Sequence, residues 1–469
     1  MENKEFNSIS MKIADFALSL SYEDIPVFVL EHGYLLLLDT FGVAMSCKEA
    51  EHAKAINRAL SAMGSSGPCT LWGSAEKVSI ADAVLYNAGL IHGADYDDTH
   101  VGGIVHPSAA VVSTALVVGE YVGASGREMM TAIVAGWEII VRLALAAKGR
   151  FHDVGYHGTG IVSPFAAACV TAKLMKLPKD VLVNALGICG SQSAALQEFL
   201  RDGSWVKKIH PGWAGHSAIY AVMMAKEGLT GPLKVFEGEF GLWKTHFGSI
   251  DGLEEQMEDF HKIWHTTEIA FKLYPVCHMT HSFIDCLLAL KREYSFNADE
   301  IKSVECRIEP RCFHIVCEPM DAKKRPQTDY MMRFSLPFVV SIAAIKDRVS
   351  PWEIDIKYAK EAAVQALMDK VHCVSDEAMK NPGYFPGWVQ VTLKDGTVIS
   401  HQQLYESGTT QNPTNVEDVI AKYENNMSAF YTKKQIQHIK ALTFEFDHLE
   451  NTSDLFSALL LKKEKTTTI

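Results

Sequence analysis

Consecutive apolar, alanine-rich segments make up much of the first half of the chain, and they constrain its fold more than any other feature. Their boundaries carry helix signals: Pro107 is typical of a first helical turn, Gly123 of a helix end, and Ser125 with Glu128 of a capping box. The segments are apolar on more than one face, which is typical of helices inside a large all-helical body. The expected helices lie at 107–122, 126–149, 163–177 and 180–196.

Strand signals replace this pattern after about residue 268. The segment 303–310 alternates apolar and polar residues, as a half-buried strand does. The segment 388–400 predicts a hairpin whose two-residue turn is Asp395-Gly396. Between these strands, two further segments are expected to be helical, at 335–345 and 353–371.

The tail returns to a helical pattern from Asn415 onward, which we expect to rejoin the first half. The predicted fold is therefore mainly α, with a large all-helical domain and a smaller α+β domain inserted into it. The boundaries we expect are 1–267 for the first part of the helical domain, 268–400 for the α+β domain and 401–469 for the C-terminal part of the helical domain.

Composition disfavours several classes of protein. The net charge of −12 argues against a nucleic-acid partner, because phosphate binding needs a basic surface. Ten cysteines without a C-x-x-C pair, and an N-terminus without a signal or transit pattern, predict a cytoplasmic protein with reduced thiols. In the most apolar window, 131–147, Glu138 and Arg142 stand four residues apart, which favours a buried helix over a membrane span, so no membrane partner is expected.

Histidines and aspartates are densest between His92 and His106. The sequence leaves three interpretations open. Asp97 and Asp98 can cap a helix or turn beside satisfied core histidines, the cluster can bind a metal ion, or it can form a general acid/base site. Because no H-E-x-x-H or other recognised metal spacing is present, we expect no metal site.

Three shorter motifs add candidate residues. His157 stands in a glycine-rich turn before a helix, where backbone N–H groups favour anions, although a tight turn with an incidental histidine is the simpler interpretation. Lys207 and Lys208 are flanked by apolar residues, as is Lys272, and a buried ammonium needs a carboxylate partner. Together these sites contain what a small carboxylate pocket needs, namely cations and an acid/base pair.

The motifs HGADYDDTH…VHPSA, GYHGTG, VKKIHPGWAGHSA and FKLYPVCHMTHSFID resemble, in this order, those of the MmgE/PrpD family. That family includes 2-methylcitrate dehydratases, cis-aconitate decarboxylases and an iminodisuccinate epimerase, and the resemblance covers essentially the whole chain. It implies a helical domain with a smaller lid domain, a homodimer, and catalysis without a metal or organic cofactor.

The resemblance also implies roles for individual residues. His106 is the expected proton-transfer group, and Asp95 orients it or balances its charge. His157, Lys207 and Lys272 hold substrate carboxylates, and Thr99 donates a hydrogen bond. Two neighbours of these residues, Lys208 and His100, are counted as further candidate substrate-binding residues, although between the adjacent lysines we favour Lys207.

Two positions depart from the family pattern as we align it. Phe338 stands where the decarboxylases are expected to have a tyrosine, and His100 stands where the dehydratases have a tryptophan. The expected activity is therefore a lyase acting on a di- or tricarboxylate, by dehydration or decarboxylation, with epimerisation as an alternative. A catalytically silent carboxylate-binding protein and a metal hydrolase using the His/Asp cluster are the rival hypotheses.

Overall fold

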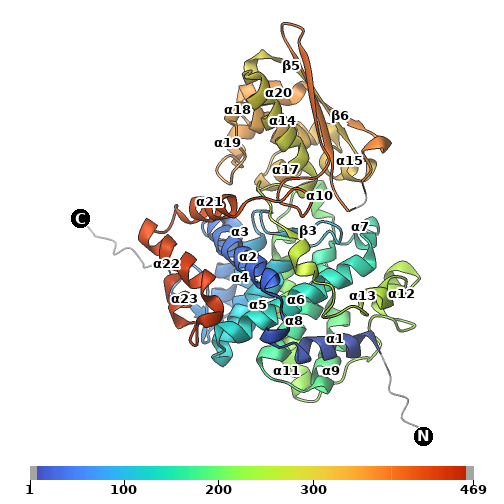
Figure 1. Cartoon of the computed structure of the whole chain (residues 1–469), viewed down its shortest axis with the longest axis vertical. Helices are drawn as coiled ribbons and strands as arrows, with labels where there is room; N and C mark the ends of the chain where they lie inside the picture. The colour runs from blue at the N-terminus through green and yellow to red at the C-terminus, as the bar shows by residue number, and fades with distance from the viewer. Residues whose placement is uncertain (1–7, 382, 461–469) are drawn as a thin grey trace.

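Two lobes of unequal size make up the chain, a larger helical one and a smaller one that carries a sheet (Figure 1). This computed structural model describes residues 8–381 and 383–460. Helices dominate the described residues, so the predicted mainly α fold with a smaller α+β domain is confirmed. Each lobe has its own cluster of buried apolar side chains, while the exact domain boundaries stay a prediction.

The helix α8 (Gly158–Leu174) lies at the centre of the larger lobe, between α5 (Pro107–Val122), α6 (Gly126–Ala147) and α11 (Val206–Lys226). Every residue of α8 is buried except Lys173, which explains why its sequence is apolar on all faces. By length and composition, α6 and α2 (Val27–Ser46) resemble membrane spans, but 94% and 67% of their apolar windows are buried inside the protein.

The predicted helix boundaries around α5 and α6 are confirmed. Gly123 ends α5 in the left-handed conformation, with φ +70°, which glycine adopts without steric cost. Ser125 and Glu128 form the expected capping box at the start of α6. The next helix departs from the prediction: α8 begins at Gly158 instead of residue 163, so that Pro164 lies in its second turn.

The C-terminal helices return to the larger lobe, as the sequence predicts, and Figure 1 shows the red α21 (Val416–Met427) beside the blue α2. A buried ion pair joins them, because Lys422 Nζ lies 2.8 Å from Asp39 Oδ1 and both side chains are at most 4% exposed. Pairing is required there, since either charge alone would be buried without compensation.

The smaller lobe, called the lid below, holds a sheet with strand order β6-β5-β7-β8. Its strands are β5 (Ile301–Ile308), β6 (Val371–Ser375), β7 (Gly387–Leu393) and β8 (Val398–Gln403). The alternation predicted for β5 is confirmed, and α14 (His281–Tyr294) and α18 (Leu336–Lys346) pack on the sheet.

Two local predictions for the lid were wrong. The β7–β8 hairpin has a three-residue loop, because Leu393 still pairs with Thr397, and Gly396 adopts φ +94° at its end, as in a bulged three-residue turn. The helix expected at 353–371 is broken into α19 (Ile356–Ala359) and α20 (Ala362–Asp369). Its last residue instead begins β6, which pairs in parallel with β5, so tertiary strand pairing outweighed local helix propensity.

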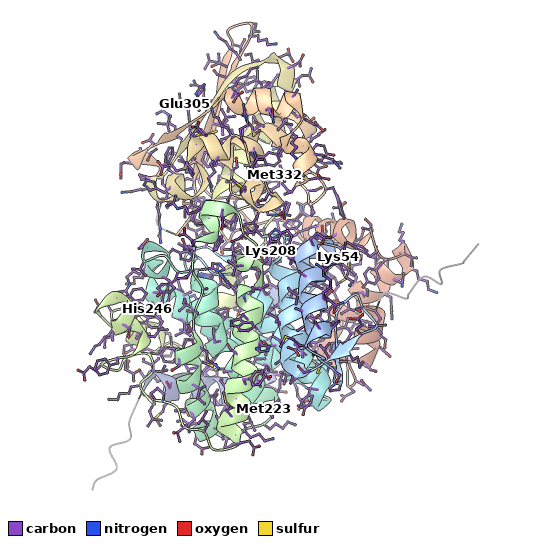
Figure 2. All side chains as sticks on the ribbon, turned by 180° about the vertical axis from the view of Figure 1, so that it is seen from behind. Lys54, Lys208, Met223, His246, Glu305 and Met332 are labelled. Carbon is purple, nitrogen blue, oxygen red and sulfur yellow. The ribbon has the colours of Figure 1, made fainter. Side chains whose placement is uncertain are left out.

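The two lobes meet along a short antiparallel pairing between β3 (Thr99–His100) and β4 (Ile269–Ala270). Figure 2 shows Lys208 at this junction, with Met332 above it in the lid and Met223 far below it in the helical lobe. The segment 94–106, which carries half of the candidate residues, therefore lies directly under the lid.

Candidate active site

A cavity of about 70 Å³ lies at the junction of the two lobes, and we call it the junction cavity. Six predicted residues line it together: Asp95, Thr99, His106, His157, Lys207 and Lys272. The first five come from the helical lobe and Lys272 comes from the start of the lid. The rest of the wall is largely apolar and includes Phe199, Phe334 and Phe385. Buried charged groups therefore face one another among apolar side chains, where their interactions are strong.

Asp95 pairs with both lysines of the cavity. Its Oδ1 lies 2.7 Å from Lys207 Nζ and 3.2 Å from Lys272 Nζ, and all three side chains are at most 6% exposed. Burial alone would raise the pKa of Asp95, but the two ammonium groups hold it well below its ordinary value. Burial lowers the pKa of Lys272. The two cations are thus compensated by one carboxylate, which leaves the cluster with capacity for an anion.

Three successive carbonyl groups around Asp95 accept hydrogen bonds from three cations that come from distant parts of the chain. The donors to the carbonyls of Ala94, Asp95 and Tyr96 are Arg333 (2.6 Å), Lys272 (2.6 Å) and Lys422 (3.0 Å). Asp95 itself has φ +50°, an uncommon conformation for a non-glycine residue. The lid, the junction and the C-terminal helix α21 therefore jointly hold the Asp95 carboxylate in place.

His106 stands immediately before α5 with its two ring nitrogens in different environments. Nδ1 lies 3.0 Å from the Asp98 carbonyl oxygen and 3.3 Å from Asp97 Oδ1, so it carries the proton and donates it. Nε2 lies 3.7 Å from Asp95 Oδ1, and it presents its lone pair beside the lysine cluster. Burial lowers the pKa of His106 to about 4, although Asp97 opposes this shift. At neutral pH the ring is therefore uncharged and can accept a proton.

Asp97 and His92 are site residues that sequence reasoning missed. Asp97 Oδ2 lies 2.8 Å from His92 Nδ1, and the His92 and His106 rings are 4.6 Å apart. The two imidazoles hold the pKa of Asp97 low although burial acts to raise it. The sequence showed the cluster but not which of its aspartates faces His106. We expected Asp95 to orient His106 or to balance its charge. The groups that orient the ring through Nδ1 are instead Asp97 and the Asp98 carbonyl.

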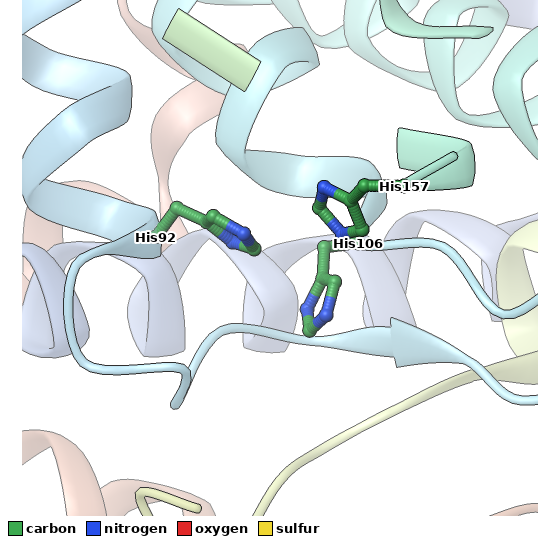
Figure 3. Close-up of side chains that lie close together, drawn as sticks. All are labelled: His92, His106 and His157. Atoms are coloured by element: carbon green, nitrogen blue, oxygen red, sulfur yellow. The ribbon is translucent and has the colours of Figure 1, made fainter. Parts of the chain in front are cut away.

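Figure 3 shows His92, His106 and His157 grouped around one point, each from a different segment. One nitrogen from each ring lies within 4.8 Å of the others, so these imidazoles form a set that can hold a transition-metal ion. Asp95 and Asp97 with His106 form an alternative set. Histidine side chains also act as proton shuttles, so the same three neighbouring rings offer a framework for proton transfer.

Two predicted residues, Lys208 and His100, do not line the cavity. Lys208 follows Lys207 in a helix and is thus rotated to another face, where its Nζ lies 2.8 Å from Asp329 Oδ2 in the lid. His100 follows Thr99 in a strand and points to the opposite side, where Nε2 lies 3.0 Å from Glu268 Oε2. Side-chain direction keeps both residues away from the cavity, and their role in substrate binding stays a prediction.

Other residues of the cavity were not predicted. His278 lines it with both ring nitrogens lacking a hydrogen-bond partner among the described residues, and His152 lies behind His157. His278 belongs to the motif that contains Lys272, so a signal was present. Phe338 is fully buried in the lid core and does not line the cavity, so it presents no group to a ligand there.

Comparisons with known proteins are consistent along the whole chain. Residues 11–252 match the MmgE/PrpD N-terminal domain, and residues 274–445 match the MmgE/PrpD C-terminal domain. The cis-aconitate decarboxylase-like protein oryM of Aspergillus oryzae is 24% identical, over 96% of this chain and 97% of its own. The cis-aconitate decarboxylase of Aspergillus terreus is 22% identical, over 97% and 96%. The 2-methylcitrate dehydratase of Escherichia coli is 20% identical, over 95% of each chain.

Proposed function

The chain belongs to the MmgE/PrpD family, and from that premise we propose that it is a lyase acting on a small di- or tricarboxylate at the junction cavity. The observation that carries the proposal is the pairing of two buried lysines with one aspartate, beside an imidazole that is uncharged at neutral pH. Such a cluster attracts carboxylates, and the imidazole next to it can move a proton on carbon.

In a dehydration, Nε2 of His106 would take a proton from a carbon next to a carboxylate. The substrate carboxylates would be held by Lys207 and Lys272, whose positive charges also stabilise the enolate-like transition state. The hydroxyl group would leave from the next carbon as water after protonation by a second acid of the cavity. Thr99, which lies 3.5 Å from His106 Nδ1 through its Oγ1, would help to position substrate or ring.

In a decarboxylation, the same lysines would hold the carboxylates that remain on the substrate. Loss of carbon dioxide leaves an electron pair on carbon, and a protonated imidazole then supplies the proton that completes the product. Because burial lowers the pKa of His106 to about 4, this route needs the charges of a bound substrate to raise it. The pKa of His106 with substrate bound therefore decides which of the two reactions the cavity can support.

An epimerase is the second candidate, and one observation favours it. The rings of His106 and His157 are 6.1 Å apart and both line the cavity. Epimerisation by two bases needs one group to remove a proton from carbon and another to return it on the opposite face. An iminodisuccinate-like dicarboxylate between these rings would meet that requirement.

The direct test is incubation of the purified protein with cis-aconitate, 2-methylcitrate and an iminodisuccinate precursor mixture, followed by proton NMR in D₂O. The lyase proposal expects loss of one substrate with appearance of an alkene, together with deuterium incorporation for decarboxylation. Epimerisation would show deuterium exchange on a substrate carbon without loss of water or carbon dioxide. Tight binding of these compounds without turnover would favour the silent carboxylate-binding protein instead.

We further propose, from family membership, that the protein works as a homodimer in the cytoplasm. Sedimentation equilibrium of the purified chain and fractionation of the source cells test these two statements. A monomer at micromolar concentration, or recovery with membranes, would contradict them.

A further inference from the structure

His157 and His210 form a hydrogen-bonded pair of imidazoles behind the junction cavity. His157 precedes α8, and His210 lies in α11, which packs against α8. Their Nδ1 atoms are 3.1 Å apart, and the rings are 4% and 8% exposed. Two Nδ1 atoms at this distance need one donor and one acceptor, so a single proton lies between the rings.

The two histidines face different spaces. His157 lines the junction cavity, whereas His210 lines a separate pocket of about 500 Å³ that also includes Leu196, Val206 and Trp213. We call this second space the outer pocket. Leu196 and Trp213 in its wall are 62% and 52% exposed, so solvent reaches it. Phe199 lines both spaces.

No other hydrogen bond engages either ring among the described residues, so the Nε2 atom of each is free to exchange a proton on its own side. The pair therefore has the connectivity of a relay, because His157 lines the junction cavity, His210 lines the outer pocket and one proton is shared between them. A structural hydrogen bond alone would not require the second ring to reach solvent.

We propose that His210 is a relay residue that carries protons between the outer pocket and His157, and so recharges the junction cavity from solvent. The inference rests on the proposed function, because decarboxylation consumes one proton in each turnover. It adds a residue and a route to that function, since His210 does not line the junction cavity.

The proton balance is closed at each step. A hydronium ion or buffer acid in the outer pocket gives a proton to Nε2 of His210, and its own bond to that proton breaks. The Nδ1–H bond of the resulting imidazolium breaks as its proton forms a new N–H bond at Nδ1 of His157. The Nε2–H bond of His157 then breaks as that proton passes to the acceptor in the junction cavity, so one proton enters the pair and one leaves it. Each ring returns to its starting tautomer by exchanging protons with water on its own side as it rotates about its Cβ–Cγ bond, which moves no net proton between the two spaces.

Two variants of His210 separate a relay from a structural role. His210→Asn places an amide near the Nδ1 position, so it keeps a hydrogen-bond partner for His157 but has no second ring nitrogen. His210→Ala leaves a space open to the outer pocket, into which added imidazole can diffuse. His216→Asn is the matched control, because His216 lies on the same helix and stacks on Trp213 without lining either space.

With the substrate that the protein turns over, both His210 variants are expected to lose kcat on the order of 10²-fold with little change in KM. Imidazole should restore His210→Ala in a saturable manner and leave His210→Asn unchanged, while His216→Asn keeps the wild-type rate. A wild-type kcat in His210→Asn, or an imidazole-insensitive His210→Ala, would overturn the proposal.

A measurement without substrate keeps the inference separate from the proposed function. In ¹⁵N-histidine NMR of the substrate-free protein, one Nδ1 of the pair should be protonated and the other not. The shared proton should exchange with solvent faster in the wild type than in His210→Asn. Equal exchange rates would refute the relay even if the protein turned over none of the tested carboxylates, whereas absent turnover with the expected exchange would refute only the lyase assignment.

Discussion

Lys207 Nζ lies 2.7 Å from Asp95 Oδ1, in a place where the lysine side chain is 6% exposed and the aspartate 2%. The cation that is expected to hold a substrate carboxylate already has a carboxylate partner within the protein. A substrate therefore joins or replaces an internal anion instead of meeting a bare charge. This relationship makes the affinity of the site depend on both members of the pair, in opposite directions.

Replacing Lys207 with alanine should weaken carboxylate binding. The lost charge-assisted hydrogen bond is worth about 1.5–3 kcal/mol, or roughly a 10- to 150-fold rise in Kd by calorimetry. Lys208→Met is the matched control, because Lys208 pairs with Asp329 away from the cavity. It should lower Tm while the Kd stays within about twofold. Equal effects of the two substitutions on Kd would show that Lys207 has no specific role in carboxylate binding.

Asp95→Asn should have the opposite effect on binding. Removing the internal carboxylate leaves Lys207 and Lys272 without an anionic partner, so a substrate dicarboxylate becomes their only source of compensation. We expect the Kd for a dicarboxylate to fall and the Tm of the ligand-free protein to fall, with recovery of Tm when ligand is added. Thermal unfolding with and without ligand measures both. A higher Kd would contradict the idea that the Asp95 carboxylate and the substrate compete for the same two lysines.

His106→Asn should abolish turnover, by a factor on the order of 10²–10⁴, because it removes the group placed to exchange a proton with the substrate carbon. The asparagine amide can still donate to the Asp98 carbonyl, so the segment should stay in place. Circular dichroism and Tm check the fold, and product formation by NMR measures the rate. Turnover within tenfold of the wild type would remove His106 from its proposed role.

Stability should decrease as the pH falls from about 6.5 to 4.5. Burial lowers the pKa of His106 to about 4 and those of His152 and His210 to about 3, so the unfolded chain binds more protons than the folded one in this range. Asp39, Asp98, Glu237, Asp285 and Glu406 act in the opposite direction, because burial raises their pKa values, to about 8 for Asp98 and about 7 for Glu406. The histidines outnumber them, since burial also lowers the pKa of His32, His52, His157, His278 and His281.

Urea unfolding at a series of pH values tests this expectation at constant ionic strength. The free energy of unfolding should fall with each step toward acid, and histidines with lowered pKa values should remain neutral by NMR while the fold persists. A free energy of unfolding that is flat or rises toward pH 4.5 would mean that the carboxyl groups with raised pKa values dominate.

The local rules of helix formation made much of the larger lobe predictable. Pro107, Gly123, and the Ser125–Glu128 box act within one turn of chain, so their effect does not depend on distant residues. Where pairing partners were distant, prediction failed: residue 371 leaves a helical pattern to begin β6 because β5 offers it a parallel partner. The hairpin was predicted, but its loop length was not.

The candidate site was likewise predicted in its local motifs but not in its side-chain directions. The motifs identified Asp95, Thr99, His106, His157, Lys207 and Lys272, and the structure brings all six to one cavity. Lys208 and His100 share those motifs but point elsewhere. The side-chain directions of adjacent residues are about 100° apart around a helix axis, and in a strand adjacent side chains lie on opposite faces. Which of two adjacent side chains faces the cavity depends on how the helix or strand that carries them packs against its neighbours.

The amino-acid sequence by itself determined which segments are helical, that an α+β unit is inserted, and which chemical groups are available, because these depend on composition and local spacing. Only the tertiary structure decided that Asp97 faces His106, that three distant cations hold the Asp95 loop, and that His210 pairs with His157. The physical reason is that such contacts join residues up to 326 positions apart in the chain, and their distances are set by how helices and lid pack.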